Sequence, residues 1–101
     1  MIFQVAKVKD VPPGTMLGTV VGGEKILVAN IGGEFYAMRS VCNHVGGPLE
    51  KGKLADNVVT CPWHGSKWDV KTGKLVEFAA PLPPEPVYKT IVEEDKILVD
   101  V

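Results

Sequence analysis

The sequence predicts an all-β fold in which antiparallel sheets form a sandwich or barrel, and three observations favour it. Runs of β-branched and aromatic residues alternate with short turns of glycine, proline and asparagine. The 101 residues include 11 glycines and 8 prolines. No long stretch repeats its apolar residues at the helical period. Because this length suits one domain, we expect a single domain over residues 1–101.

The first half of the chain predicts a strand followed by a three-stranded antiparallel meander. A β-rich run covers residues 2–8, and the Val11-Pro12-Pro13-Gly14 stretch that follows is typical of a turn. The three meander strands are expected at residues 15–21, 25–31 and 34–40, with Gly-Gly pairs at 22–23 and 32–33 between them. Two glycines between two β-rich runs are typical of a tight hairpin.

The second half predicts shorter strands and a closing hairpin. Turn signals at Asp56-Asn57 and Thr72-Gly73 frame short strands at 58–60 and 67–70. The last hairpin is expected at 88–92 and 96–101, on either side of the acidic turn 93–95. The stretch between the two halves is rich in glycine, polar and aromatic residues. We therefore expect a base β-domain made of residues 1–40 and 74–101, with a small subdomain, residues 41–73, inserted between its strands.

Charge and hydropathy exclude several classes of partner. The net charge of −1 argues against nucleic acid, because neutralising phosphates requires a basic excess. No apolar run approaches the roughly 20 residues of a membrane helix, and the start of the chain does not resemble a signal peptide. We therefore expect a cytoplasmic protein with no membrane partner.

Basic residues are concentrated in one part of the sequence. Residues 51–74 hold five lysines against two aspartates, a net charge of +3. This stretch is either an ordinary solvated surface or a basic face that steers an acidic partner. The lysines that would form such a face are Lys51, Lys53, Lys67 and Lys71.

All the cysteine and histidine of the chain lies in two short motifs. The first is Cys42-Asn43-His44 and the second is Cys61-Pro62-Trp63-His64, with 16 residues between them. Two thiolates and two imidazoles indicate a metal site, either a structural zinc site or a two-iron cluster. Each motif supplies one cysteine and one histidine in the same order. That order favours a cluster in which the thiolates hold one iron and the imidazoles hold the other.

The residues around these motifs resemble the Rieske family. The resemblance rests on Gly46-Gly47-Pro48-Leu49, on Cys61-Pro62-Trp63-His64-Gly65-Ser66-Lys67-Trp68-Asp69 and on Thr72-Gly73, and with the flanking strands it covers essentially the whole chain. It implies a small β-domain with an inserted cluster-binding subdomain. It also implies a Rieske-type [2Fe–2S] cluster with the ligands Cys42, His44, Cys61 and His64, in which each imidazole binds iron through Nδ1.

Departures from the family pattern refine this interpretation. Rieske proteins of cytochrome complexes carry an extra cysteine in each cluster segment, joined as a disulfide. Here the corresponding positions are Gly47 and Trp63, so packing, with Trp63 as a candidate, is expected to hold the segments. Ser66 matches a serine whose hydroxyl donates to a bridging sulfide, although it could equally cap a turn. Trp68 replaces a tyrosine that would donate to a cysteine sulfur. We therefore expect a reduction potential below that of the cytochrome-complex class.

Further residues are expected to surround the cluster. The segment 81–86 holds four prolines and is either a rigid connector or a cover on a third side of the cluster. The residues assigned to tuning or packing are Gly46, Gly47, Trp63, Ser66, Trp68 and Pro81.

Elimination leads from this ligand set to a function. Both histidines are assigned to the cluster, so none remains for the mononuclear iron of an oxygenase. No phosphate-binding glycine motif indicates a flavin or nicotinamide site. The sequence therefore predicts a one-electron carrier rather than an enzyme, and we expect this carrier to be a monomer. The resemblance implies a stand-alone Rieske-type ferredoxin that passes electrons from a ferredoxin reductase to a terminal oxidoreductase, such as an aromatic-ring dioxygenase. The alternatives are a small subunit of a reductase of the nitrite-reductase type and a zinc-stabilised β-module that binds proteins.

Overall fold

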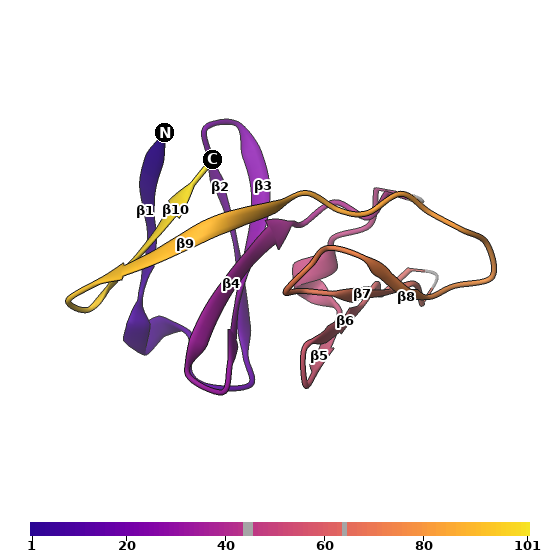
Figure 1. The fold of residues 1–101 in the computed structure, drawn as a ribbon, viewed down its shortest axis with the longest axis horizontal. Coiled ribbons are helices and arrows are strands. Elements are labelled where there is room, and N and C mark those ends of the chain that lie inside the picture. The colour runs from indigo at the N-terminus through magenta and orange to yellow at the C-terminus, as the bar shows by residue number, and fades with distance from the viewer. Residues whose placement is uncertain (44–45, 64) are drawn as a thin grey trace.

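The computed structural model describes residues 1–43, 46–63 and 65–101. Strands in the described part of the chain form two antiparallel sheets (Figure 1), which confirms the all-β prediction. The six-stranded sheet has the order β1 (Ile2–Lys7), β10 (Lys96–Asp100), β9 (Val87–Glu93), β4 (Glu34–Arg39), β3 (Glu24–Ile31) and β2 (Met16–Val21). The four-stranded sheet has the order β5 (Lys53–Ala55), β6 (Val58–Thr60), β7 (Lys67–Asp69) and β8 (Leu75–Glu77).

The predicted meander is confirmed by the register of β2, β3 and β4. Val21 lies opposite Glu24 across the first turn, so Gly22 and Gly23 alone form the loop. These two glycines have φ of 57° and 80°, the left-handed values that a two-residue hairpin of this kind requires. The predicted closing hairpin is also present as β9 and β10.

Two short strands of the small sheet, and the pairing between the first and last strands of the large sheet, were not predicted from the sequence. β5 and β8 were not predicted, and each adds an edge to the four-stranded sheet. β1 pairs with β10, the last strand of the chain. In the part of the chain that the structure describes, the helical segments are two short 3₁₀ turns, η1 (Val8–Asp10) and η2 (Leu49–Lys51). Among the described residues, no helix is long and apolar enough to cross a membrane.

Strand β3 is buried on both of its faces, and this links the two halves of the molecule. Side chains alternate across a strand, so Ile26 and Val28 face one core while Leu27 and Ala29 face the other. The first core is formed by the six-stranded sheet and the segment after η1, and it contains Val11, Ile26, Val28, Ala37, Ile97 and Val99. The second core joins the two sheets and contains Leu27, Ala29, Met38, Cys42, Leu49, Val59, Cys61, Trp68 and Val70. Both cysteines therefore belong to the core between the sheets.

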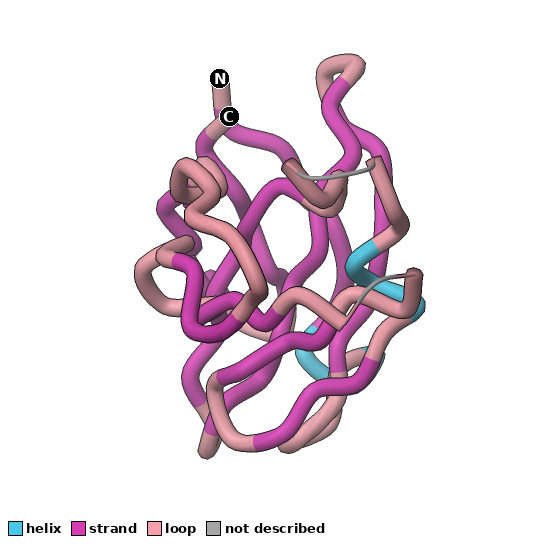
Figure 2. Tube along the Cα trace, turned by 90° about the vertical axis from the view of Figure 1, so that its right-hand side faces the viewer, coloured by secondary structure: helices cyan, strands magenta, loops and turns pink. Residues whose placement is uncertain are grey.

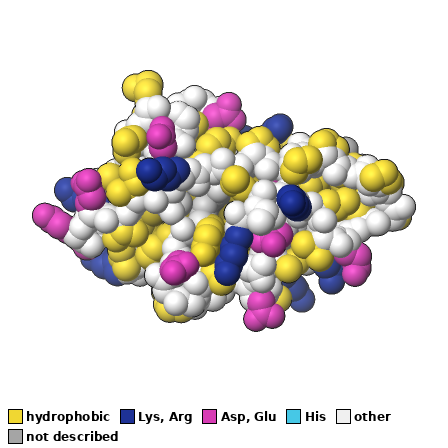
Figure 3. Space-filling view, in the orientation of Figure 1, with side chains coloured by type: hydrophobic (Ala, Val, Ile, Leu, Met, Phe, Trp, Pro, Cys, Tyr) yellow, Lys and Arg dark blue, Asp and Glu magenta, His cyan; other side chains and the backbone are white. Residues whose placement is uncertain are grey.

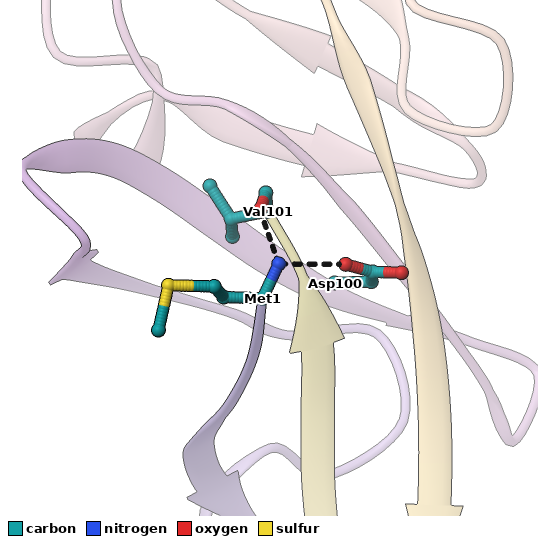
Figure 4. Close-up of polar contacts among 3 residues, drawn as sticks. All are labelled: Met1, Asp100 and Val101. Carbon is teal, nitrogen blue, oxygen red and sulfur yellow. Dashed lines mark hydrogen bonds and ion pairs between the residues drawn. The ribbon is translucent and has the colours of Figure 1, made fainter.

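The two ends of the chain meet at the top of the six-stranded sheet, on the side away from the small sheet (Figure 1). The Met1 amino group donates to the Val101 carbonyl at 2.9 Å and to Asp100 Oδ1 at 3.2 Å (Figure 4). When the molecule is turned by 90°, the segments around the four-stranded sheet face the viewer and both termini lie at the top (Figure 2). The cysteine-bearing segments thus lie far from the chain ends.

Candidate metal centre

The segment after Cys42 forms a tight backbone turn. The Cys42 carbonyl accepts a hydrogen bond from the Gly46 N–H at 2.8 Å, and the Cys42 N–H donates to the Gly47 carbonyl at 2.9 Å. Gly46 has a φ of 74°, a left-handed value that strongly favours glycine. The predicted importance of Gly46 therefore has a physical basis in this turn.

The segment after Cys61 repeats the same turn. The Cys61 carbonyl accepts from the Gly65 N–H at 3.1 Å, and the Cys61 N–H donates to the Ser66 carbonyl at 2.8 Å. Gly65 has a φ of 76°, so each cysteine is followed, four residues later, by a left-handed glycine. Sequence reasoning did not single out Gly65, although this shared spacing is visible in the sequence.

Each turn places a residue against the cysteine of the other turn. A side-chain carbon at Gly47 would lie 2.9 Å from Cys61 Sγ, and Ser66 Oγ lies 3.3 Å from Cys42 Sγ. The two cysteines are 2% and 1% exposed and are not joined as a disulfide. The turns therefore bring two buried thiols together, and soft thiolates of this kind suit iron–sulfur or zinc chemistry.

A chain of two contacts links Trp68 to the first thiol. The Trp68 indole N–H donates to Ser66 Oγ at 3.0 Å, and both side chains are fully buried. An indole nitrogen can only donate, so the Ser66 hydroxyl accepts this bond and keeps its own proton for another acceptor. A metal-binding cysteine is a thiolate without a proton. In that state the bond must run from the Ser66 hydroxyl to Cys42 Sγ.

The positions that correspond to the cytochrome-type disulfide lie beside each other. Ring carbons of Trp63 are 3.3 and 3.4 Å from the side-chain carbon that Gly47 lacks. The Trp63 side chain is nevertheless 58% exposed, so it lies over Gly47 at the surface rather than inside the core. Any side chain at position 47 would also meet Cys61 Sγ, which explains why this position takes glycine.

Asn43 and Glu85 form a contact that sequence reasoning missed. The Asn43 backbone N–H donates to Glu85 Oε2 at 2.8 Å, and Asn43 Nδ2 donates to the carbonyls of Pro83 at 2.9 Å and Pro84 at 3.2 Å. The only sequence signal was one acidic residue within a run of prolines.

The Glu85 carboxyl has an unusual environment, because it is only 2% exposed. Burial raises its pKa to about 7, although the Asn43 N–H and the Arg39 charge both act to lower it.

The predicted ligands His44 and His64 lie outside the described residues. Among the residues that are described, no three His, Cys, Asp or Glu side chains form a group that could hold a metal. Cys42 and Cys61 are brought together, while the full ligand set stays a prediction. Pro81, which was also predicted to lie near the cluster, is exposed in the segment between β8 and β9.

The predicted basic residues differ in their surroundings. Lys51 and Lys53 line a surface hollow of about 370 Å³ whose other walls include Cys61 and Pro62. Lys71 instead lies over the ring of Tyr36, with Nζ 5.4 Å from the ring centre. Lys67 is half-buried in β7. Two of the four lysines therefore lie next to the second cysteine.

Comparisons with known proteins agree with this geometry. Residues 1–91 match the family described as the Rieske [2Fe-2S] domain. The chain is 42% identical over 91 residues to the ferredoxin component of biphenyl 2,3-dioxygenase from Rhodococcus jostii, covering 90% of this chain and 84% of that protein.

Solved structures show the same likeness. The ferredoxin of carbazole 1,9a-dioxygenase from Nocardioides aromaticivorans has a TM-score of 0.91 and 28% identity, with 97% of this chain and 95% of that chain covered. A chain in a complex of reduced oxygenase and oxidised ferredoxin of carbazole 1,9a-dioxygenase has a TM-score of 0.89 and 30% identity, with 97% and 91% covered.

The family's cofactor fits the site. Two thiols buried in matching turns match the two cysteine ligands of a Rieske-type [2Fe–2S] cluster, which two histidines complete. The family match covers most of the chain, including both cysteine turns and the strands that carry them. The chain is therefore a member of the Rieske [2Fe–2S] domain family.

Proposed function

We propose that this protein is a one-electron carrier, a Rieske-type ferredoxin that takes electrons from a ferredoxin reductase and passes them to the terminal oxygenase of a dioxygenase system. The observation that carries the proposal is the pair of matching turns that buries Cys42 and Cys61 together. Relatives that are ferredoxin components of dioxygenases support it. The protein acts as a cytoplasmic monomer and does no chemistry on a substrate of its own.

The proposed ligands are Cys42 and Cys61 for one iron and His44 and His64 for the other. When bound, the cluster supplies reversible one-electron transfer. The chain contributes the rest: it holds the two thiolates in hydrogen-bonded turns and keeps water away from their buried sulfur atoms. Residues 41–73 act as the cluster-binding subdomain on the base formed by 1–40 and 74–101.

The reduction potential is set in part by the Ser66 hydroxyl. Donors to a cluster sulfur stabilise the more negative reduced state and raise the potential. Ser66 is placed to donate to Cys42 Sγ, and Trp68 fixes the direction of that hydroxyl. Because the indole donates to Ser66 rather than to a cysteine sulfur, we propose a potential below that of the cytochrome-complex class. Gly46, Gly47, Trp63 and Pro81 shape the packing around the site.

The docking surface for partners is proposed at the end of the molecule that carries the cysteine turns. Hydrophobic side chains gather there in the space-filling view, over the small sheet and the segment that follows it (Figure 3). Lys51 and Lys53 border the hollow beside Cys61, so they are better placed than Lys67 and Lys71 to orient an acidic partner. Weak redox complexes need only small interfaces steered by charge.

Spectroscopy of anaerobically purified protein tests the central proposal. We expect a reddish-brown protein with about two irons per chain, visible charge-transfer bands and a rhombic EPR signal after reduction. A colourless, zinc-loaded protein from iron-replete cells would instead support the zinc-stabilised β-module. A stable complex with a large haem-containing enzyme would support the reductase subunit.

Charge reversal tests the docking surface. Lys51→Glu combined with Lys53→Glu is expected to slow electron transfer to an oxygenase about tenfold at low salt, with the difference shrinking as salt rises. The matched control is Lys89→Glu combined with Lys96→Glu, which makes the same change in net charge at exposed positions of β9 and β10. Equal effects of the two pairs would contradict a docking role for Lys51 and Lys53.

A further inference from the structure

A buried carboxylate lies in a mostly exposed, proline-rich segment. Residues 81–86 connect β8 to β9, and four of the six residues are proline. Among the described residues, Glu85 is the one charged side chain that is buried, at 2% exposure. Its Oε1 has no hydrogen-bond partner among them. Burying a carboxyl group in this way costs free energy, so its single well-made bond needs an explanation.

That bond reaches the first cysteine segment. Glu85 Oε2 accepts the backbone N–H of Asn43 at 2.8 Å, and Asn43 is the residue between Cys42 and His44. The Asn43 side chain adds two bonds to the carbonyls of Pro83 and Pro84. The proline-rich segment therefore accepts hydrogen bonds from both the backbone N–H and the side-chain amide of Asn43.

The same segment is fixed on its other side. The Glu85 backbone N–H donates to the Gly73 carbonyl at 2.7 Å, and the Arg39 N–H donates to the Pro86 carbonyl at 2.9 Å. Gly73 has no room for a side chain, because a carbon there would collide with the Glu85 carbonyl oxygen. The Gly73 N–H in turn donates to the carbonyl of Asp69, the last residue of β7. Glu85 thus joins the first cysteine segment to the turn that follows β7.

We propose that Glu85 and Asn43 form a latch that closes the segment 81–86 onto the first cysteine segment, and that Glu85 is a positioning residue for the cluster site. The proposal rests on the proposed function, since it assigns the latch to a cluster-binding site. The carboxylate does not bind iron in this arrangement. It holds the backbone between the two proposed ligands of that segment, so that the segment cannot move away from the metal.

The latch opposes local opening, so its loss is expected to speed the release of iron. The measurement is the rate at which the visible absorption of the oxidised holoprotein bleaches in excess iron chelator, which follows the opening of the site. Glu85→Ala leaves the Asn43 N–H unpaired and is expected to bleach about tenfold faster than the wild type. Glu85→Gln keeps one carbonyl oxygen for that N–H and is expected to stay within about twofold of the wild type.

Two further variants complete the design. Asn43→Ala keeps the backbone N–H but loses both side-chain bonds, and it is expected to bleach about fivefold faster. Glu77→Ala is the matched control, because Glu77 is an exposed glutamate on β8, and it is expected to bleach at the wild-type rate. The reduced-state EPR signal gives a second readout. It should broaden in Glu85→Ala and return to the wild-type shape in Glu85→Gln.

The outcomes separate the latch from the proposed function. A wild-type protein without Rieske absorption and EPR signals would overturn the proposed function itself. A wild-type protein that has these signals, with Glu85→Ala and Asn43→Ala both bleaching at its rate, would overturn the latch alone. If Glu85→Ala does not fold, the bleaching rates of Asn43→Ala and Glu85→Gln still test the latch. The latch predicts a faster rate for Asn43→Ala than for Glu85→Gln.

Discussion

The two sheets of this molecule are stabilised in different ways. Strands of the six-stranded sheet are five to eight residues long, and β2, β3 and β4 pair in continuous ladders. Every strand of the four-stranded sheet has three residues. Such short ladders supply few backbone hydrogen bonds, so the small sheet depends on other contacts. The proposed metal site lies in the half of the molecule with the less regular backbone.

Packing compensates for the short ladders. Trp68 of β7 and Val59 of β6 share one core with Leu27 and Met38 of the large sheet. Both cysteines belong to the same core. The large sheet therefore acts as a base against which the cysteine turns are fixed, and changes in the small sheet should affect the cluster before they affect the base.

Cys61→Ala is expected to give the largest difference in effect between the small sheet and the large sheet. Loss of one proposed ligand should abolish the visible absorption and the bound iron completely, because a thiolate ligand has no substitute in the described part of the site. The six-stranded sheet should stay folded. Hydrogen exchange checks this, with protection lost in β6 and β7 but kept in β3. A coloured variant with full iron content would contradict the ligand assignment.

A pair of core truncations compares the two cores directly. Trp68→Ala should cost about 3–5 kcal/mol of unfolding free energy, and Ile97→Ala about 2–5 kcal/mol, since both side chains are fully buried. The variants should differ in their iron content. Trp68→Ala is expected to lose the cluster, while Ile97→Ala keeps it at temperatures where it remains folded. Equal cluster retention in both would contradict the division between base and cluster region.

A smaller effect is expected from the Trp68–Ser66–Cys42 contacts. Ser66→Ala removes the donor to Cys42 Sγ and should lower the reduction potential, whereas Trp68→Phe removes only the group that orients the hydroxyl and should lower it less. Redox titration of both variants and of the double variant measures this. Because Trp68 acts through Ser66, Trp68→Phe should add little once Ser66 is alanine. Additive shifts would show that the two residues act separately, and no shift in Ser66→Ala would exclude a tuning role.

The smallest effect is expected at the chain ends. Asp100→Asn removes the ion pair with the Met1 amino group, whose atoms lie 3.2 Å apart at the surface. Such pairs contribute about 0–1 kcal/mol to stability. The measured free energy of unfolding should therefore decrease by no more than this amount in the variant. The potential and iron content should not change. A shift in potential would mean that the two ends of the molecule are coupled.

Local patterns in the sequence were enough to predict most of the large sheet. The Gly-Gly pairs at 22–23 and 32–33 and the alternating runs beside them specify a meander through short-range contacts alone. The four-stranded sheet was harder, because β5 and β8 are too short to show alternation. The pairing of β1 with β10 joins segments from the two ends of the chain, and no local sequence pattern predicts such a contact.

Some residues of the candidate site could also be predicted from the sequence, and others could not. Cys42 and Cys61 stand out because of their spacing, and Ser66 and Trp68 because they are close to the second motif in sequence. Glu85 and Asn43 could not be paired, since they lie 42 positions apart in the sequence and neither residue type indicates the bond. Gly65 was within reach, because its spacing from Cys61 repeats that of Gly46 from Cys42.

The meeting of the two chain ends has a practical consequence for engineering. A peptide, a fluorescent label or an electrode tether joined at Met1 or Val101 would project from the top of the six-stranded sheet, away from the small sheet (Figure 1). Adjacent termini also make a domain suitable for insertion into a loop of another protein. The molecule can therefore be immobilised or fused at its terminal end while the surface proposed for electron exchange stays open to solution.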